Sequence, residues 1–208
     1  FTFQPLPRFA QAAPSYGVVA TDIDGDGLVE VVAAQNMFTR EPETGLWRGG
    51  IGVILEYGAD GAFRVEPAAE TGFIVDGDAK GLTLCDLDGD NRPDFVLCQN
   101  NDKLLAWKNR GDSKPLFSVR LHGSPGNPDG IGARIIAHYT DGTVHATEMT
   151  AGNGYLSQSQ PIVYFSAAGT PIRELEIRWP DGETTKATPD TKSSSIEISK
   201  RLLSKTTR

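Results

Sequence analysis

Asp22–Glu30 reads DIDGDGLVE and Asp86–Asp94 reads DLDGDNRPD, so one acidic nine-residue loop occurs twice in this chain of 208 residues. Carboxylates stand at loop positions one, three, five and nine in both copies. Two like charges about 4 Å apart repel by roughly 1 kcal/mol in bulk water, and by more where water is excluded. Four acids in one short loop therefore require a cation, and oxygen ligands at irregular spacing favour Ca²⁺ over Mg²⁺.

The side chains predicted to bind calcium are the acids at these four positions of each loop. They are Asp22, Asp24, Asp26 and Glu30 in the first loop, and Asp86, Asp88, Asp90 and Asp94 in the second. A loop that only reversed the chain would need glycine, but it would not need four spaced acids. The sequence therefore predicts two Ca²⁺ sites.

The EF-hand shares this Asp-x-Asp-x-Asp opening, but it also needs glycine at position six and Glu at position twelve, between two helices. Position six is Gly27 in the first loop and Asn91 in the second, and position twelve is Ala33 and Leu97. The flanking runs are short, apolar and rich in β-branched residues, which is typical of buried strands. These runs are residues 17–20, 31–34, 81–84 and 95–97. The pattern predicts a strand-loop-strand unit and excludes the EF-hand.

The repeat extends beyond the loops, because residues 17–36 align with residues 81–100 without a gap and Phe9 falls on Phe73. A repeat of this length with several strands in each unit is typical of propeller blades or a β-solenoid. Two units cannot close a ring that takes about 4–8 blades. We therefore expect that further blades precede these two, or that the C-terminal region or a partner chain covers the open edges.

At these residues the sequence resembles the FG-GAP or VCBS repeat, the calcium-loop blade of integrin α-subunits and many bacterial surface proteins. The resemblance implies calcium ligation by the acids named above, with the backbone carbonyls of Leu28 and Arg92 as further ligands. In the second loop Asn91 replaces a glycine that helps the turn, and Arg92 adds a cation beside the loop. Both departures predict weaker binding at the second site.

Composition favours a secreted, calcium-dependent protein. The formal net charge is -7, and there is no basic stripe with interleaved aromatic residues, which excludes nucleic acid as a partner. Extracellular calcium modules work at about 10⁻⁴–10⁻³ M Ca²⁺, which the cytosol does not offer. No apolar run is long enough to span a bilayer. We expect an extracellular, cell-surface or periplasmic location. The first residue is Phe1 rather than Met, as processing of a longer chain or a shortened sequence would each give.

The pattern changes after about residue 111, where alternating segments separated by turns predict a small antiparallel sandwich or barrel. The expected strands cover residues 117–121, 133–140, 143–150, 161–166, 172–179 and 183–188. Asp141-Gly142 is a strong signal for a two-residue hairpin loop. Leu175, Ile177 and Trp179 alternate with polar residues, so we expect their side chains on a buried face.

Four motifs in this region resemble the ASPIC/UnbV domain, which usually follows FG-GAP repeats, as in the cartilage acidic protein group. They are Leu121–Gly123 (LHG), Gly126–Arg134 (GNPDGIGAR), Gly152–Ser159 (GNGYLSQS) and Trp179–Gly182 (WPDG). The resemblance covers residues 117–188 and implies an extracytoplasmic interaction module with no settled chemistry. The expected organisation is two repeats at 1–62 and 63–116, an ASPIC/UnbV-like β domain at 117–190, and a C-terminal strand and basic tail at 191–208.

The two cysteines flank the second acidic loop. Pairing of its strands as a hairpin predicts Cys98 opposite Leu82 and Cys85 opposite Phe95, which places the sulfurs too far apart for an unstrained disulfide. Buried free thiols are the favoured interpretation, because Cys often packs as a small hydrophobe.

Three smaller features could indicate binding sites. Arg110–Ser113 spells an integrin-binding tetrapeptide, but an ordinary turn into the next strand is the favoured interpretation, because the motif has no structural context. A two-residue loop would place His138 opposite His145, yet a zinc site needs at least three protein ligands, so a half-exposed polar pair is favoured. The GNGY run at residues 152–155 fits a tight glycine turn better than an anion or sugar site.

No sequence motif indicates catalysis, because Gly-x-Ser-x-Gly, His-Glu-x-x-His and phosphate-binding loops are all lacking. We therefore expect a non-enzymatic calcium-binding scaffold or subunit that mediates protein–protein interaction. The alternative is a carbohydrate-binding module in which Trp47, Trp107 and Trp179 stack on sugar rings. The basic tail from Ser199 to Arg208 is expected to pack against its own domain or a partner.

Overall fold

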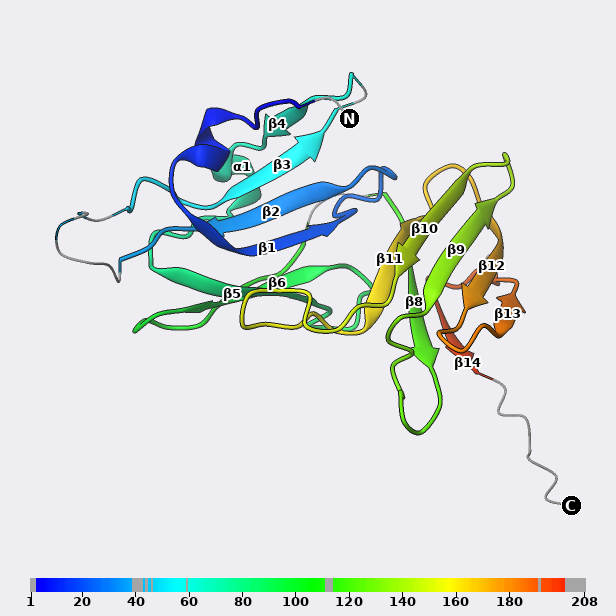
Figure 1. Cartoon of the computed structure of the whole chain (residues 1–208). Helices are drawn as coiled ribbons and strands as arrows, with labels where there is room; N and C mark the ends of the chain where they lie inside the picture. Colours follow the sequence, from blue (N-terminus) through cyan, green and yellow to red (C-terminus); the bar gives the residue numbers. More distant parts are fainter. Residues whose placement is uncertain are drawn as a thin grey trace, which may run out of the picture. The chain divides into compact units, whose positions relative to one another are not determined.

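A computed structural model describes residues 3–38, 43, 45, 47–58, 60–110, 114–190 and 192–200 (Figure 1). Over these residues the chain is nearly all β, with the short helix α1 (Ala68–Thr71) and a 3-10 turn at Arg8–Gln11. None of the helices in this described part has the length and apolar character that crossing a membrane requires. Residues 111–113 of the expected tetrapeptide and residues 201–208 of the tail lie outside the described residues.

The chain divides into two compact units, and neither is one uninterrupted stretch of sequence. The first unit contains Phe1–Ile23, Leu28–Gly111 and Gly152–Gln160. The second contains Asp24–Gly27, Asp112–Ala151 and Pro161–Arg208. Each unit therefore includes a short segment that sequence order would assign to the other.

The first unit has two antiparallel sheets, each a simple meander (Figure 1). One sheet consists of β1 (Ser15–Thr21), β2 (Glu30–Gln35), β3 (Val53–Tyr57) and β4 (Phe63–Val65). The other consists of β5 (Ala79–Cys85), β6 (Asp94–Gln99) and β7 (Leu105–Trp107). Each acidic loop joins the first two strands of its sheet, so the expected strand-loop-strand units are confirmed.

The two sheets of the first unit share one apolar core. Val19, Val32 and Ile54 of the first sheet belong to the same buried cluster as Leu82 and Leu97 of the second. Ala33, Val53 and Leu55 form a separate small cluster with partly buried neighbours. Because side chains alternate between the faces of a strand, the first sheet contributes apolar residues on both of its faces.

The internal repeat is also a repeat of backbone geometry. Val18 pairs with Ala33 in the first sheet, and the positions 64 residues later, Leu82 and Leu97, pair in the second. The register shift near the start of β1 also recurs near the start of β5. The gapless alignment of the two copies therefore corresponds to the same strand register.

The predicted register around the cysteines is wrong by one residue. Cys85 pairs with Asp94 rather than Phe95, and Leu82 pairs with Leu97 rather than Cys98. The cause is that Asp94, the last acid of the loop, is already the first residue of β6. Both thiols are free, but Cys98 is exposed, so the expected burial is wrong for Cys98, while Cys85 is half-buried.

The second unit has two sheets. One has the order β10-β9-β12-β13, with β9 (Arg134–Tyr139), β10 (Val144–Glu148), β12 (Ile172–Arg178) and β13 (Thr184–Ala187). The other has the order β11-β8-β14, with β8 (Leu116–His122), β11 (Ile162–Ser166) and β14 (Ser195–Ser199). Every strand expected from the sequence is present, and within the described residues no sheet closes into a barrel.

One buried cluster holds these two sheets together, as in a sandwich. It includes Val119 and Leu121 of β8 together with Ile135 of β9 and Leu175 and Ile177 of β12. The buried face predicted for Leu175, Ile177 and Trp179 is confirmed. The strands expected between residues 117 and 188 pair antiparallel, whereas β14, from the C-terminal segment, runs parallel to β8. A parallel neighbour needs a long connection, and β14 comes last in the chain, after β9–β13.

The hairpin between β9 and β10 has a three-residue loop rather than the expected two-residue loop. Tyr139 N donates to Thr143 O, and Gly142 has a φ of 91°. A glycine with positive φ at the end of a three-residue loop is a common hairpin solution. The extra loop residue shifts the register by one, so His138 pairs with Val144 and not with His145.

Candidate functional site

The second acidic loop lies entirely within the first unit and gathers three of its four predicted side-chain ligands. One carboxylate oxygen from each of Asp86, Asp88 and Asp90 lies within 4.8 Å of the others. Asp86 is half-buried, and Asp88 and Asp90 are exposed. The three acids sit at alternate positions of a bend, so local chain geometry alone brings them together.

Backbone amides fix the first acid of this loop. Asp86 Oδ1 accepts hydrogen bonds from Gly89 N at 2.7 Å and Asp90 N at 3.2 Å, and Asp86 Oδ2 accepts one from Asn91 N at 3.0 Å. Asn91 has a φ of 64°, a conformation that Asn tolerates better than most residues, so it replaces the expected glycine. Carboxylate oxygens have about four lone-pair sites in total, so these bonds leave capacity for a cation.

The fourth acid, Asp94, is completely buried and lies outside the group of three. Asp94 Oδ2 accepts a hydrogen bond from Leu87 N at 2.8 Å, and Asp94 Oδ1 accepts one from Asn109 N at 2.7 Å. A buried carboxylate is costly unless such donors or a cation compensate its charge. Through its bond with Leu87 N, Asp94 therefore links the first residue of β6 to the start of the second acidic loop.

In the first loop, Asp22 and Glu30 belong to the first unit, and Asp24 and Asp26 belong to the second. Glu30 Oε2 accepts a hydrogen bond from Ile23 N at 2.7 Å, which repeats the bond from Leu87 to Asp94 at the same loop positions. Asp22 and Glu30 are buried, with exposed fractions of 7% and 5%. Asp26 N donates a hydrogen bond to Asp24 Oδ1 at 2.9 Å.

The two residues expected to contribute carbonyl ligands, Leu28 and Arg92, lie in the bends of their loops and are half-buried. In the second loop Lys108 Nζ forms an ion pair with Asp88 Oδ2, and Lys108 lies just beyond β7. The donor set of both loops consists of oxygens only, with several acids, and this fits Ca²⁺.

Sequence reasoning missed Asn109, which contacts elements of both loops within the first unit. Its backbone N binds Asp94, and its side-chain Nδ2 donates to Ile23 O at 3.0 Å. These partners are 15 and 86 residues away in the sequence. No local motif could indicate that contact, since it depends on how the strands pack.

Sequence reasoning also missed the role of residues 152–160, which belong to the first unit and line strand β5. Ser157 Oγ donates to Leu82 O at 2.9 Å, and Thr83 Oγ1 donates to Gln158 O at 2.7 Å. Gln160 N donates to Leu84 O at 2.8 Å. The GNGYLSQS motif therefore supports the strand that enters the second acidic loop.

The three tryptophans have different environments. Trp179 is buried, and its Nε1 donates to Thr185 Oγ1 at 2.8 Å. Trp107 is half-buried, with Nε1 donating to Gly72 O at 3.0 Å, whereas Trp47 is 51% exposed. Core packing therefore accounts for Trp179.

Comparison with known proteins supports the assignment of the C-terminal region. Residues 123–201 match the sequence model of the family described as ASPIC and UnbV. The chain is also similar to proteins named Cartilage acidic protein 1, with 22% identity over 180 residues in Mus musculus, 25% in Xenopus tropicalis and 21% in Homo sapiens. These alignments cover 85% of this chain but only 27%, 27% and 26% of the relatives, so the chain spans about a quarter of their length. The ASPIC/UnbV part of the predicted resemblance is thereby confirmed.

Proposed function

We propose that this protein is a calcium-binding scaffold outside the cytoplasm, in which Ca²⁺ stabilises the acidic loops of two propeller-type sheets. The main observation in favour is that three features of the two loops recur at equivalent positions. The acids, the strand register and the hydrogen bond from loop position two to loop position nine all recur 64 residues apart.

The chemistry of the loops supports a cation as the resident ligand. The second loop holds three carboxylate oxygens within 4.8 Å of one another, and like charges at such spacing repel. Asp22, Glu30 and Asp94 are also buried. In this proposal the cation offsets the repulsion, and folding and calcium affinity are coupled.

The packing of the first sheet supports the propeller-type interpretation. Leu82 and Phe73 are 1% and 2% exposed in the core between the two sheets. Their counterparts 64 residues earlier, Val18 and Phe9, are 42% and 70% exposed. By analogy with the second copy, a further repeat or a partner chain would pack on this exposed face of the first sheet. We propose that this packing is the protein–protein interaction of the scaffold.

The proposal includes an extracytoplasmic location and a non-enzymatic role. The name of the relatives refers to cartilage, which is compatible with an extracellular place of action. Millimolar calcium outside cells would keep loops of modest affinity occupied. We propose no catalytic role, because the acids that are gathered in the loops serve to hold a cation in a closed set of oxygens.

A carbohydrate-binding function is the weaker candidate. Such a site would need an exposed aromatic platform, and Trp179 and Trp107 are engaged in packing and in hydrogen bonds from their indole nitrogens. Trp47 is the most exposed of the three tryptophans. We therefore favour protein–protein interaction.

Isothermal titration calorimetry with Ca²⁺ tests the proposal. We expect two Ca²⁺ per chain, and Asp22→Asn and Asp86→Asn should each remove or strongly weaken one site. Asp76→Asn is the matched control, because Asp76 is exposed and lies outside both loops. Absence of binding, or titrations that are the same in all variants, would refute the calcium sites.

A further inference from the structure

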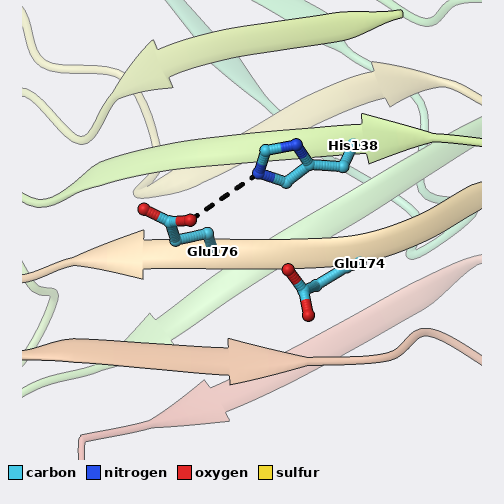
Figure 2. Close-up of side chains that lie close together, drawn as sticks. All are labelled: His138, Glu174 and Glu176. Carbon is cyan, nitrogen blue, oxygen red and sulfur yellow. Dashed lines mark ion pairs between the residues drawn. The ribbon is translucent and has the colours of Figure 1, made fainter. Parts of the chain in front are cut away.

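A third group of potential metal ligands lies in the second unit, on the outer face of its four-stranded sheet. His138 of β9 pairs with Glu174 of β12, and Glu176 follows two residues later on the same face. A register shift between Ile172 and Glu174 places Glu174 opposite His138. Figure 2 shows the three side chains gathered from the two strands, and their ligand atoms lie within 4.8 Å of one another.

The position of the imidazole is the unusual feature of this group. His138 Nε2 is buried and has no hydrogen-bond partner, although buried polar atoms are nearly always paired. Its nearest carboxylate atom is Glu176 Oε2 at 3.7 Å, the contact that is dashed in Figure 2. That distance is too long for a hydrogen bond.

The same distance is close to the spacing of two ligands around one metal ion. Zinc lies about 2.0–2.2 Å from imidazole nitrogen and carboxylate oxygen, so tetrahedral geometry separates neighbouring donor atoms by about 3.3–3.6 Å. The outer side chains also have solvent access, since Glu174 is 32% exposed and His138 is 25% exposed. Small rotamer changes would bring all three donors to an ion.

We propose that His138, Glu174 and Glu176 form a Zn²⁺ site, with water completing the fourth position. An imidazole with two carboxylates suits zinc and related transition metals, whereas Ca²⁺ takes oxygen ligands only. The site is therefore chemically distinct from the acidic loops. It does not depend on the proposed calcium function.

Two cationic side chains already form ion pairs with the carboxylates, so Zn²⁺ must compete with them for carboxylate oxygens. Lys186 Nζ lies 2.7 Å from Glu174 Oε1, and Arg178 Nε lies 2.6 Å from Glu176 Oε1. Arg178 uses Oε1 of Glu176, and Oε2 is the oxygen that faces His138. One oxygen thus remains for the metal without breaking the Arg178 pair.

The test is a Zn²⁺ titration of the whole chain in saturating Ca²⁺, so that the acidic loops do not compete. Wild type should bind one Zn²⁺ per chain. His138→Ala and Glu174→Gln should each weaken Zn²⁺ binding at least ~10-fold, because losing even a residue that only hydrogen-bonds to a metal ligand lowers metal affinity by about that factor. His122→Ala is the matched control, because His122 forms an ordinary 2.9 Å contact with Glu197 on the other sheet.

A second readout reports the ligands directly. Co²⁺ in place of Zn²⁺ should give a visible absorption band in wild type and in His122→Ala, and the band should be lost in His138→Ala. Circular dichroism confirms that each variant is folded. If His138→Ala does not fold, Glu174→Gln replaces it as the test variant. No Zn²⁺ binding by wild type, or equal binding by all the variants, would overturn the proposal.

Discussion

A Cβ atom on Gly17 of β1 would lie 2.6 Å from the Cβ of Leu82 in β5, so these strands approach each other more closely than any side chain permits. Gly81, the counterpart of Gly17 in the repeat, instead faces residues 155–157, with Ser157 Cβ at 3.3 Å from its own notional Cβ. The same repeat position thus packs against a strand in one copy and against the 152–160 segment in the other.

Gly17→Ala should destabilise the first unit by about 1–3 kcal/mol, because overpacking forces strands or side chains to move. Thermal or urea unfolding measures this change. Gly126→Ala is the control, since a Cβ on Gly126 would have open space within 4 Å. Equal stability of Gly17→Ala and the control would contradict the close packing of β1 on β5.

Asn36→Ala should be among the more damaging polar substitutions in the first unit. Asn36 is fully buried, its Nδ2 donates to Gly50 O at 2.9 Å and to Gly77 O at 3.2 Å, and its Oδ1 accepts from Gly50 N at 3.0 Å. Leaving such groups unpaired costs about 1–3 kcal/mol each. Asn36 also has a φ of 88°, which Ala adopts less readily.

The matched control for that substitution is Asn100→Ala, at the same repeat position. Asn100 is exposed, and its Nδ2 donates to Asp78 Oδ2 at 3.1 Å. Chemical denaturation should show a clearly smaller loss for Asn100→Ala. If the two variants lost the same stability, the role assigned to the buried amide would be wrong.

Gln160→Ala should loosen the entry to the second acidic loop. Asp86 N donates to Gln160 Oε1 at 2.9 Å, and that acceptor disappears in the variant. Amide hydrogen exchange at Asp86 should therefore become faster. Gln4→Ala is the matched control, because it removes the same side chain at an exposed position near the start of the chain. Unchanged exchange at Asp86 would argue against the packing of residues 152–160 on β5.

The two thiols should react at different rates. Burial, and then the charges of Asp94 and Asp86, raise the pKa of Cys85. A raised pKa leaves less thiolate at neutral pH, so Cys85 should be alkylated slowly and should speed up as pH rises through its pKa. Cys98 is exposed and should react first. Mass spectrometry of wild type and Cys98→Ser follows each site, and faster reaction of Cys85 would contradict the structure.

Most strands could be predicted from the sequence, since apolar alternation and Asp-Gly turns are local signals. The register could not be predicted to the residue. At His138 it depends on whether the loop has two or three residues, and at Cys85 it depends on Asp94 already belonging to the strand. One residue of loop length reverses which side chains face each other.

The acidic loops were visible in the sequence because all of their acids lie within nine residues. The proposed zinc site could be predicted only in part. His138 could be identified as a possible ligand, but Glu174 and Glu176 are 36 and 38 residues away in the sequence. The position of residues 152–160 beside β5 was not visible at all. Contacts between distant segments follow from packing, which no local pattern encodes.

Thermal unfolding with Ca²⁺ and with a chelator, together with the mass of the assembly in each condition, tests the central claim most directly. Ligand at 100 times its Kd adds about 2.7 kcal/mol, so Tm should rise by several degrees in Ca²⁺. The assembly should keep its mass, and Asp22→Asn combined with Asp86→Asn should abolish the rise. A Tm that does not respond to Ca²⁺ in the wild-type protein would contradict the account.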